Sequence, residues 1–376
     1  MKIFITGLAV SSLLLAAGCA APGREPLDLP KFERKVSLQK NWNNSLGDPR
    51  GGILSPIVAG DRICGASARS ISCFNWDTGR ELFEMEVEQQ ISGGVGAGGE
   101  EVFVGGEDGE VTLIDAGGAV RWESNVLNSV TGPPLAVGGS VIVRDVQGKL
   151  IALDRETGDF RWDFQVPSQS LILRSNPGLA VGIRESIVAG FHGGIAMNLD
   201  SVTGEELWAV NVSIPSGDND LERMADVVGT PIVLEDAVCM ATFQGRAACF
   251  DLETGRQNWS VKVSAVGSLG FDSDKIFVSD SIGHVLALNR KTGALLWRNE
   301  SFLYRNISGP ATLGRWVIVG DLKGVVSLLD STDGSFAGRA KTDGSPILTN
   351  PLVIGDKVFV QTSEGNLYAF GIDQDL

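Results

Sequence analysis

Residues 150–162 of the chain read LIALDRETGDFRW, and versions of this stretch recur along most of the sequence. It combines an apolar strand ending in Asp154, a turn at Thr157 and Gly158, and Trp162 four places after the glycine. In such a turn the Asp carboxylate can accept backbone N–H bonds, while glycine takes a left-handed conformation that a Cβ would penalise. The Trp is expected to pack as a wedge between neighbouring repeat units.

The phrase recurs at a nearly constant interval. Its other copies lie at residues 75–83, 115–122, 200–208, 251–259, 289–297 and, in degenerate form, 330–338. Upstream, Trp42 has no turn before it but falls in the same register ahead of Phe83. An interval of about 40 residues is typical of one four-stranded propeller blade.

An apolar hairpin precedes each turn, as in KIFVSDSIGHVLALN at residues 275–289, and eight such hairpins indicate eight blades. The last hairpin ends at Phe370 with no turn or aromatic residue after it. The segment around Trp42 is therefore expected to supply the missing outer strand, because an open ring would leave strand edges unpaired. The sequence thus predicts an all-β fold, a closed eight-bladed β-propeller over residues 37–376.

Composition agrees with this fold and excludes some functions. The chain has 376 residues, of which 48 are Gly and only 20% are charged, and 43% are hydrophobic, which excludes a disordered protein. Its net charge of -15 excludes a nucleic-acid partner, because phosphate binding needs a basic face.

The N-terminus has the pattern of a secretion signal. Residues 1–18 have the positive start, short apolar core and small final residues of a signal peptide. The string LLAAGC at residues 14–19 resembles the bacterial lipobox, which implies that Cys19 is lipidated and anchors the protein, and Ala20 in place of Asp implies sorting to the outer membrane. Residues 19–36 are rich in proline and charge and are predicted to be a flexible tether.

The remaining cysteines lie in two pairs at the ends of predicted hairpins, Cys64 with Cys73 and Cys239 with Cys249. Each pair could form a disulfide or remain as buried thiols. Their spacings match no zinc pattern, so no metal site is predicted. The two histidines, His192 and His284, lie in or beside hairpin turns and are read as turn residues.

The repeated phrase resembles that of pyrroloquinoline-quinone enzymes, many of which bind quinone and calcium with an adjacent cysteine pair. No adjacent cysteines occur here. The chain is more similar to the BamB family, lipoproteins of the outer-membrane β-barrel assembly (Bam) machinery that carry the repeat without the cofactor. The resemblance is most specific in SLILRSNPG at residues 170–178 and DNDLERMADVVGTPIV at residues 218–233. Both lie in the two longest repeat periods, whose extra length is expected to emerge as loops on one rim.

In that family the matching Leu, Leu, Arg and Asp contact BamA, so the resemblance assigns this role to Leu171, Leu173, Arg174 and Asp226. A second Asp of the family pattern is replaced by Val228. From the residues alone, the leucines could instead tuck onto the blade below, and the charged residues near Asp226 could be a solvated face.

The resemblance implies a non-enzymatic scaffold with no cofactor, anchored in the outer membrane and facing the periplasm. Its expected partners are the POTRA domains of BamA, and its blade edges could also pair with strands of unfolded outer-membrane proteins. Two alternatives remain: an enzyme of the quinoprotein dehydrogenase type, and a propeller that binds a sugar or peptide in its central channel.

Overall fold

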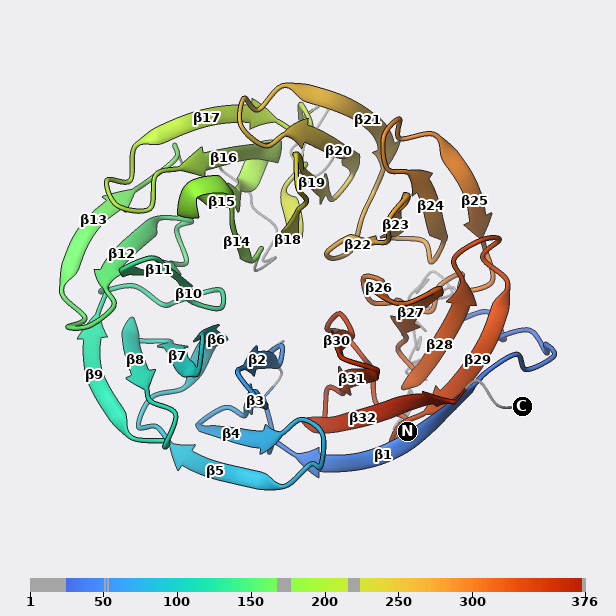
Figure 1. Cartoon of the computed structure of the whole chain (residues 1–376), viewed down its shortest axis with the longest axis horizontal. Coiled ribbons are helices and arrows are strands. Elements are labelled where there is room, and N and C mark those ends of the chain that lie inside the picture. Colours follow the sequence, from blue (N-terminus) through green and yellow to red (C-terminus); the bar gives the residue numbers. More distant parts are fainter. Residues whose placement is uncertain (1–24, 51, 53, 168–176, 216–223, 374–376) are drawn as a thin grey trace, which may run out of the picture.

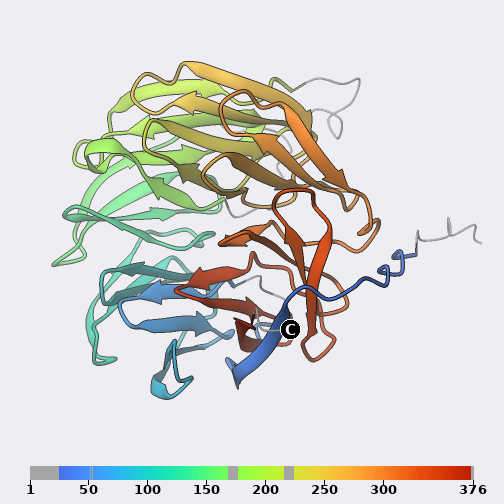
Figure 2. The same ribbon diagram turned by 45° about the vertical axis from the view of Figure 1, so that its right-hand side comes forward.

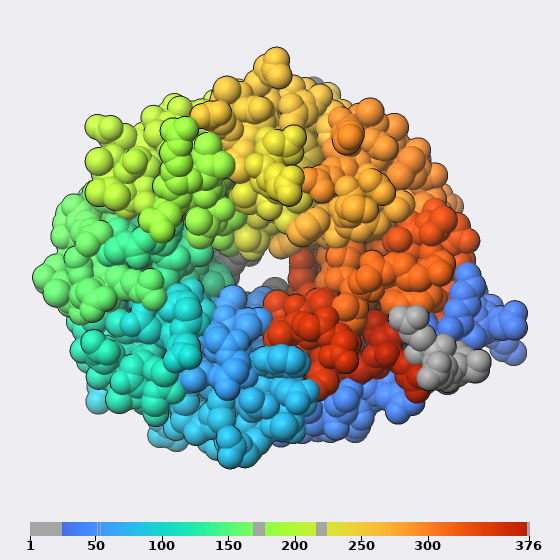
Figure 3. Space-filling model, viewed as in Figure 1, coloured from blue at the N-terminus to red at the C-terminus, as the bar shows by residue number. Residues whose placement is uncertain are grey.

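The structure, a computed structural model, describes residues 25–50, 52, 54–167, 177–215 and 224–373. The described chain forms eight four-stranded antiparallel sheets around a central opening, which confirms the predicted eight-bladed propeller (Figure 1, Figure 3). Among the described residues, no helix has the length and hydropathy needed to span a membrane.

Seven of these sheets are built from four consecutive strands, with the first strand nearest the opening (Figure 1). In chain order the strands are β2 (Ile57–Ala59), β3 (Arg62–Ala66), β4 (Ser70–Asn75), β5 (Glu81–Glu86); β6 (Ile91–Gly98), β7 (Glu101–Gly106), β8 (Glu110–Ile114), β9 (Val120–Asn125); β10 (Leu135–Val137), β11 (Ser140–Arg144), β12 (Leu150–Asp154), β13 (Phe160–Phe164); β14 (Leu179–Val181), β15 (Ile187–Gly190), β16 (Ile195–Leu199), β17 (Glu206–Asn211); β18 (Val227–Val233), β19 (Ala237–Thr242), β20 (Gly245–Asp251), β21 (Gln257–Val263); β22 (Gly270–Phe271), β23 (Lys275–Ser279), β24 (Val285–Asn289), β25 (Leu295–Asn299); β26 (Ala311–Leu313), β27 (Trp316–Gly320), β28 (Val325–Asp330) and β29 (Phe336–Lys341). Two short 3-10 turns, η1 (Ile183–Glu185) and η2 (His192–Gly194), flank β15.

The eighth sheet closes the ring. It consists of β30 (Leu352–Ile354), β31 (Lys357–Gln361), β32 (Asn366–Asp373) and, as its outer strand, β1 (Ser37–Ser45) from the other end of the chain. β1 runs antiparallel to β32, with Trp42 opposite Ala369 (Figure 1). The predicted pairing of the first and last segments is confirmed.

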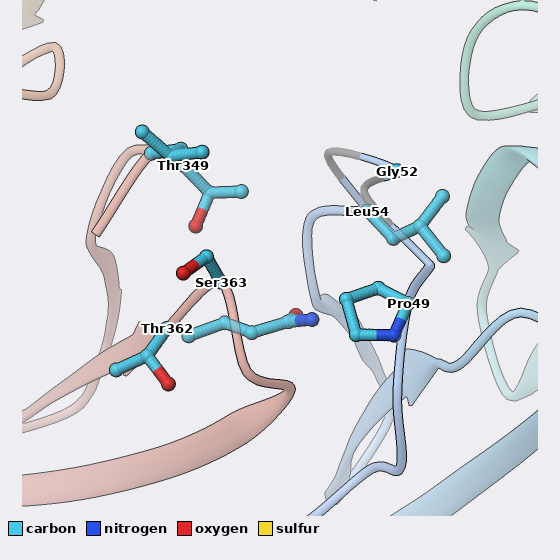
Figure 4. A pocket seen from close by; sticks show the side chains of 8 residues that line it. Pro49, Gly52, Leu54, Thr349, Thr362 and Ser363 are labelled. Carbon is cyan, nitrogen blue, oxygen red and sulfur yellow. The ribbon is translucent and has the colours of Figure 1, made fainter. Parts of the chain in front are cut away.

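Packing across this seam leaves little space. Figure 4 shows Pro49 and Leu54, from the linker after β1, on one side of a small pocket, with Thr349, from the linker before β30, and Thr362, from the turn after β31, on the other. The pocket between them has a volume of about 10 Å³, enough for roughly one water molecule.

The repeated turn locks each blade to the next. Oδ1 of Asp154 accepts the backbone N–H groups of Glu156 and Thr157 at 2.8 and 3.0 Å. Gly158 has a φ of +77°, and a Cβ placed on it would lie 2.8 Å from Cε3 of Trp122 in the preceding blade. The same glycine therefore permits the turn and makes room for the neighbouring ring.

The Trp side chains complete this junction through a hydrogen bond. Nε1 of Trp122 donates to the carbonyl oxygen of Arg155 at 2.9 Å. Five other Trp side chains donate in the same way to the next blade's turn: Trp42 to Trp76, Trp162 to Ser201, Trp208 to Leu252, Trp259 to Arg290 and Trp297 to Ser331. The prediction that these residues act as inter-blade wedges is confirmed.

Both cysteine pairs are disulfides. Cys64 lies directly opposite Cys73 across β3 and β4, and Cys239 lies opposite Cys249 across β19 and β20. Of the two alternatives that the spacing left open, the structure has the cross-linked form in both sheets.

The described part of the N-terminal stretch is packed against the ring. The sequence predicts a flexible tether over residues 19–36, but residues 25–36 lie against β29 and the linker that follows β25. The ring of Phe32 stacks on Phe336 with a centroid separation of 5.4 Å. The backbone N–H of Leu27 donates to the carbonyl oxygen of Leu303 at 3.0 Å. Cys19 lies outside the described residues.

Candidate functional site: the linker face

The two faces of the ring carry different connections. Because the strands of each sheet alternate in direction, the linker from an outer strand to the next inner strand lies on the same face as the turn between the second and third strands. We call this side the linker face and the opposite side the turn face. The linkers on the linker face are residues 46–56, 87–90, 126–134, 165–178, 212–226, 264–269, 300–310 and 342–351.

The two linkers singled out by the sequence, residues 165–178 and 212–226, both belong to the linker face. They lead into β14 and β18, which are neighbouring inner strands (Figure 1). Leu171, Leu173 and Arg174 lie outside the described residues. Asp226, the fourth predicted partner-binding residue, is described.

Asp226 is buried at the end of its linker, with 3% of its surface exposed. Its Oδ1 accepts the N–H of Gly193 in η2 at 2.8 Å, and its carbonyl oxygen accepts the N–H of Phe243 at 2.9 Å. These bonds tie the linker to turns of two adjacent blades. Val228, which replaces the second family Asp, is also buried and packs among the apolar side chains of β19, β20 and β23.

His192 interacts electrostatically with Asp226, and Arg144 in turn with His192. His192 is half-buried, and burial lowers the pKa of its imidazole, an effect that Asp226 partly opposes. Arg144, at the end of β11, donates from Nη1 to the carbonyl oxygen of Gly190 at 2.8 Å, and its guanidinium lies 5.0 Å from the centre of the Phe191 ring. Burial lowers the pKa of Arg144 to about 10.

These groups make a polar layer under the linker ends. His192 is in a turn, as predicted, but its Nε2 is buried without a hydrogen-bond partner. His284 is a satisfied turn residue, because its Nδ1 lies 2.7 Å from Oδ2 of Asp280. The hydrogen bonds of Asp226 to Gly193 and of Arg144 to Gly190 hold the turn around η2 in place beside the linker end.

Several exposed apolar side chains lie on the linker face. Leu127 and Ile214, 87% and 75% exposed, are the most exposed large apolar residues of the described chain. Further exposed members on this face are Val146, Val266, Ile282, Tyr304 and Leu348. Sequence reasoning missed them because a single apolar residue in a short linker makes no periodic pattern. Exposed apolar side chains also occur on the turn face and the outer strands, among them Val202 and Phe160, so Leu127 and Ile214 stand out by how fully they are exposed.

A groove of about 390 Å³ lies beside the end of the 212–226 linker. Its walls include Ile214, Gln244, Arg246 and Lys262. Nη1 of Arg246 is held by the hydroxyl of Ser260 at 2.9 Å. The groove thus joins an exposed apolar side chain to two cations, although the chain as a whole is acidic.

The residues present do not fit the quinone and calcium site of pyrroloquinoline-quinone enzymes. No two cysteines are adjacent in the sequence, and the four described cysteines are held in the two disulfides. Within the described ranges, no three His, Cys, Asp or Glu side chains gather as a metal site would require. The central opening of about 440 Å³ has small or rigid residues such as Gly94, Pro134 and Gly229 in its lining.

Comparison with known proteins gives one consistent family. The family model described as outer membrane protein assembly factor BamB matches residues 67–299 and 283–374. Proteins named outer membrane protein assembly factor BamB from Burkholderia pseudomallei and Pseudomonas aeruginosa are 33% and 34% identical to the chain, each over 96% of both sequences.

Solved structures agree with these relatives. The crystal structure of BamB from Moraxella catarrhalis has a TM-score of 0.82 and 28% identity, covering 89% of this chain and 99% of that one. Quinohemoprotein alcohol dehydrogenase from Comamonas testosteroni has a TM-score of 0.71 at 14% identity, over 89% of this chain and 76% of its own. At that identity the second likeness concerns the fold alone.

Proposed function

The chain belongs to the BamB family of outer membrane protein assembly factors, and from this premise we propose that its linker face docks the POTRA domains of BamA. Members of this family are non-enzymatic, and the chain acts in outer-membrane protein assembly as a scaffold. Its proposed place is the periplasmic face of the outer membrane, held there by acyl chains on Cys19.

The observation that carries this proposal is the convergence of features on one face. Both long linkers, with Leu171, Leu173 and Arg174, start and end on the linker face. The same face carries the exposed side chains of Leu127 and Ile214. Apolar anchors beside charged groups are typical of protein-binding surfaces.

Asp226 has a different task in this proposal. Because its carboxylate is buried and accepts the N–H of Gly193, it holds the end of the linker in place and does not itself reach the partner. It is therefore a positioning residue. Leu171, Leu173 and Arg174 would make the direct contacts.

Capture of BamA by the lipidated full-length protein tests the direct contacts. Arg174→Glu should weaken capture while leaving the Tm unchanged, because charge reversal removes a partner contact and not a packing contact. Arg121→Glu is the matched control, since Arg121 is exposed on the outer strand β9, away from the linker face. Equal capture by the two variants, or a large fall in the Tm of Arg174→Glu, would contradict the proposal.

A second pair of variants tests whether Asp226 acts through its hydrogen bond to Gly193 or through a direct charged contact with the partner. Asp226→Asn keeps an oxygen that can accept the Gly193 N–H, so capture and stability should both be retained. Asp226→Ala leaves that buried N–H without a partner, at a cost of about 1–3 kcal/mol, and should lose capture as well. Loss of capture in Asp226→Asn at full stability would instead assign the carboxylate to the partner contact.

A further inference from the structure

The N-terminal segment of residues 25–36 is fastened to the outer edge of β29. The rings of Phe32 and Phe336 stack, and the guanidinium of Arg339 lies 4.9 and 5.0 Å from their centres. The N–H of Lys35 donates to the carbonyl oxygen of Ala337 at 2.9 Å. These contacts hold the segment where β29 begins, near the turn face.

The other end of the segment is held at the linker face. Leu27 donates its N–H to the carbonyl oxygen of Leu303, and its own carbonyl oxygen accepts Nη1 of Arg305 at 2.8 Å. Arg305 is buried and paired with the buried carboxylate of Asp321, with Nη2 and Oδ2 2.6 Å apart. A buried ion pair is thus part of the docking site for a segment that composition alone suggests is loose.

The segment therefore sets the point where the N-terminus leaves the ring. It crosses the height of the blade from the turn face at Lys35 to the linker face at Leu27, and Figure 2 shows it projecting to the right of the ring in blue. Between Leu27, which is bonded to the linker face, and Cys19 the chain can span at most about 28 Å. A lipid-anchored Cys19 would lie within that distance of the linker face.

An apolar patch surrounds this exit point, formed by Leu27, Ile282 and Tyr304, which are 46%, 42% and 37% exposed. The members are linked through the backbone, because Tyr304 donates its N–H to the carbonyl oxygen of Ile282 at 2.9 Å and Leu27 bonds to Leu303. Lys323 is exposed on the neighbouring turn. Tyr and Lys beside aliphatic side chains are the residues that favour a membrane–water boundary.

Tyr304 adds a second sign of function. Its φ is +59°, in the left-handed region that bulky side chains rarely adopt. Residues held in this way are concentrated at functional positions, where the surrounding structure compensates for the strain. Here the strained residue is an exposed aromatic one beside the exit of the anchored chain.

We propose that the patch of Leu27, Ile282 and Tyr304 is a lipid-contact surface that rests on the bilayer holding the acyl chains of Cys19. The docked segment keeps this sector of the linker face against the membrane. The inference rests on the proposed lipidation of Cys19. The patch is formed by the turn between β23 and β24, the linker after β25 and the docked segment, whereas the proposed BamA linkers lie between β13 and β18. The two surfaces therefore occupy different sectors of the same face.

Site-specific fluorescence tests this orientation in the lipidated full-length protein. Ile282→Cys and, as control on the turn face, Val202→Cys each provide one reactive thiol, because the native cysteines are in disulfides or, as proposed, acylated. Each is labelled with bimane and bound to phosphatidylethanolamine vesicles containing phosphatidylglycerol and a nitroxide-labelled lipid. The lipid should quench the label at position 282 and leave the label at position 202 unchanged.

A further variant tests the docked segment itself. Phe32→Ser should stay attached to the vesicles through its acyl chains but lose the quenching at position 282. Phe271→Ser, which removes another partly exposed Phe far from the segment, should keep it. Retained quenching in Phe32→Ser would overturn the role of the segment.

The failures of the two proposals can be told apart. If the unsubstituted protein does not attach to the vesicles, the lipid anchor is refuted and the contact surface with it. If the protein attaches but positions 282 and 202 are quenched equally, or neither is quenched, only the lipid-contact surface is refuted.

Discussion

The inter-blade junction predicts a specific cost for replacing Gly293 by Ala. Gly293 has a φ of +70°, and a Cβ built on it would lie 2.6 Å from Cε3 of Trp259. Alanine in the left-handed region costs about 1–2 kcal/mol. Displacing a packed ring adds about 1–3 kcal/mol, so the variant should lose about 2–5 kcal/mol of unfolding free energy.

Gly314 provides the matched control. Its φ is +57°, but a Cβ there would meet nothing within 4 Å. Gly314→Ala should therefore lower the free energy of unfolding only by the backbone term of about 1–2 kcal/mol. The difference between the two variants isolates the contact with the Trp ring.

Urea unfolding followed by far-UV circular dichroism measures both variants without relying on Trp fluorescence. In a Trp259→Leu background the ring is absent, and Gly293→Ala should then cost no more than Gly314→Ala. Equal destabilisation of the two glycine variants in the native background would refute the wedge argument, as would an undiminished cost in the Leu background.

Three further outcomes follow from the structure. Replacing Cys239 and Cys249 together by Ala should lower the free energy of unfolding by about 2–3 kcal/mol, seen as a lower urea midpoint that reductant no longer changes. The hydrogen bond from the Thr254 hydroxyl lowers the pKa of Asp251 below its ordinary 3.8. Its contribution to stability is therefore complete above pH 3.8 and is lost as the pH falls through the lower folded pKa. The Tm should consequently fall less on acidification in Asp251→Asn than in the native chain. Arg305→Met should cost up to about 3–5 kcal/mol, because it leaves a buried carboxylate unpaired, and thermal unfolding that matches the native chain would contradict this.

The sequence predicted the ring because its signals are local and repeated. Each turn places Asp, Gly and Trp within a few residues, and the same contacts form at each junction, as for Gly158 and Trp122. The closure of the ring could be predicted from the number of strands, because the last hairpin lacked an outer strand and the segment around Trp42 had no sheet of its own.

Two features could not be predicted from such signals. The docking of residues 25–36 depends on Arg305 and Phe336, far along the chain, so a stretch rich in proline and charge gave no sign of its partners. The burial of Asp226 likewise depends on a turn from the neighbouring blade. Long-range pairing of single residues leaves no periodicity for sequence analysis to detect.

The seam between β1 and β32 has a consequence for biogenesis. The ribosome makes β1 first and β32 last, so the earliest strand waits without its partner until almost the entire polypeptide has been synthesised and translocated. Contacts between residues so distant in the chain form slowly, and unpaired strands are prone to aggregate meanwhile. Premature stop codons near the C-terminus should consequently be as damaging as early ones, and periplasmic chaperones would have their greatest value just before the final strand arrives.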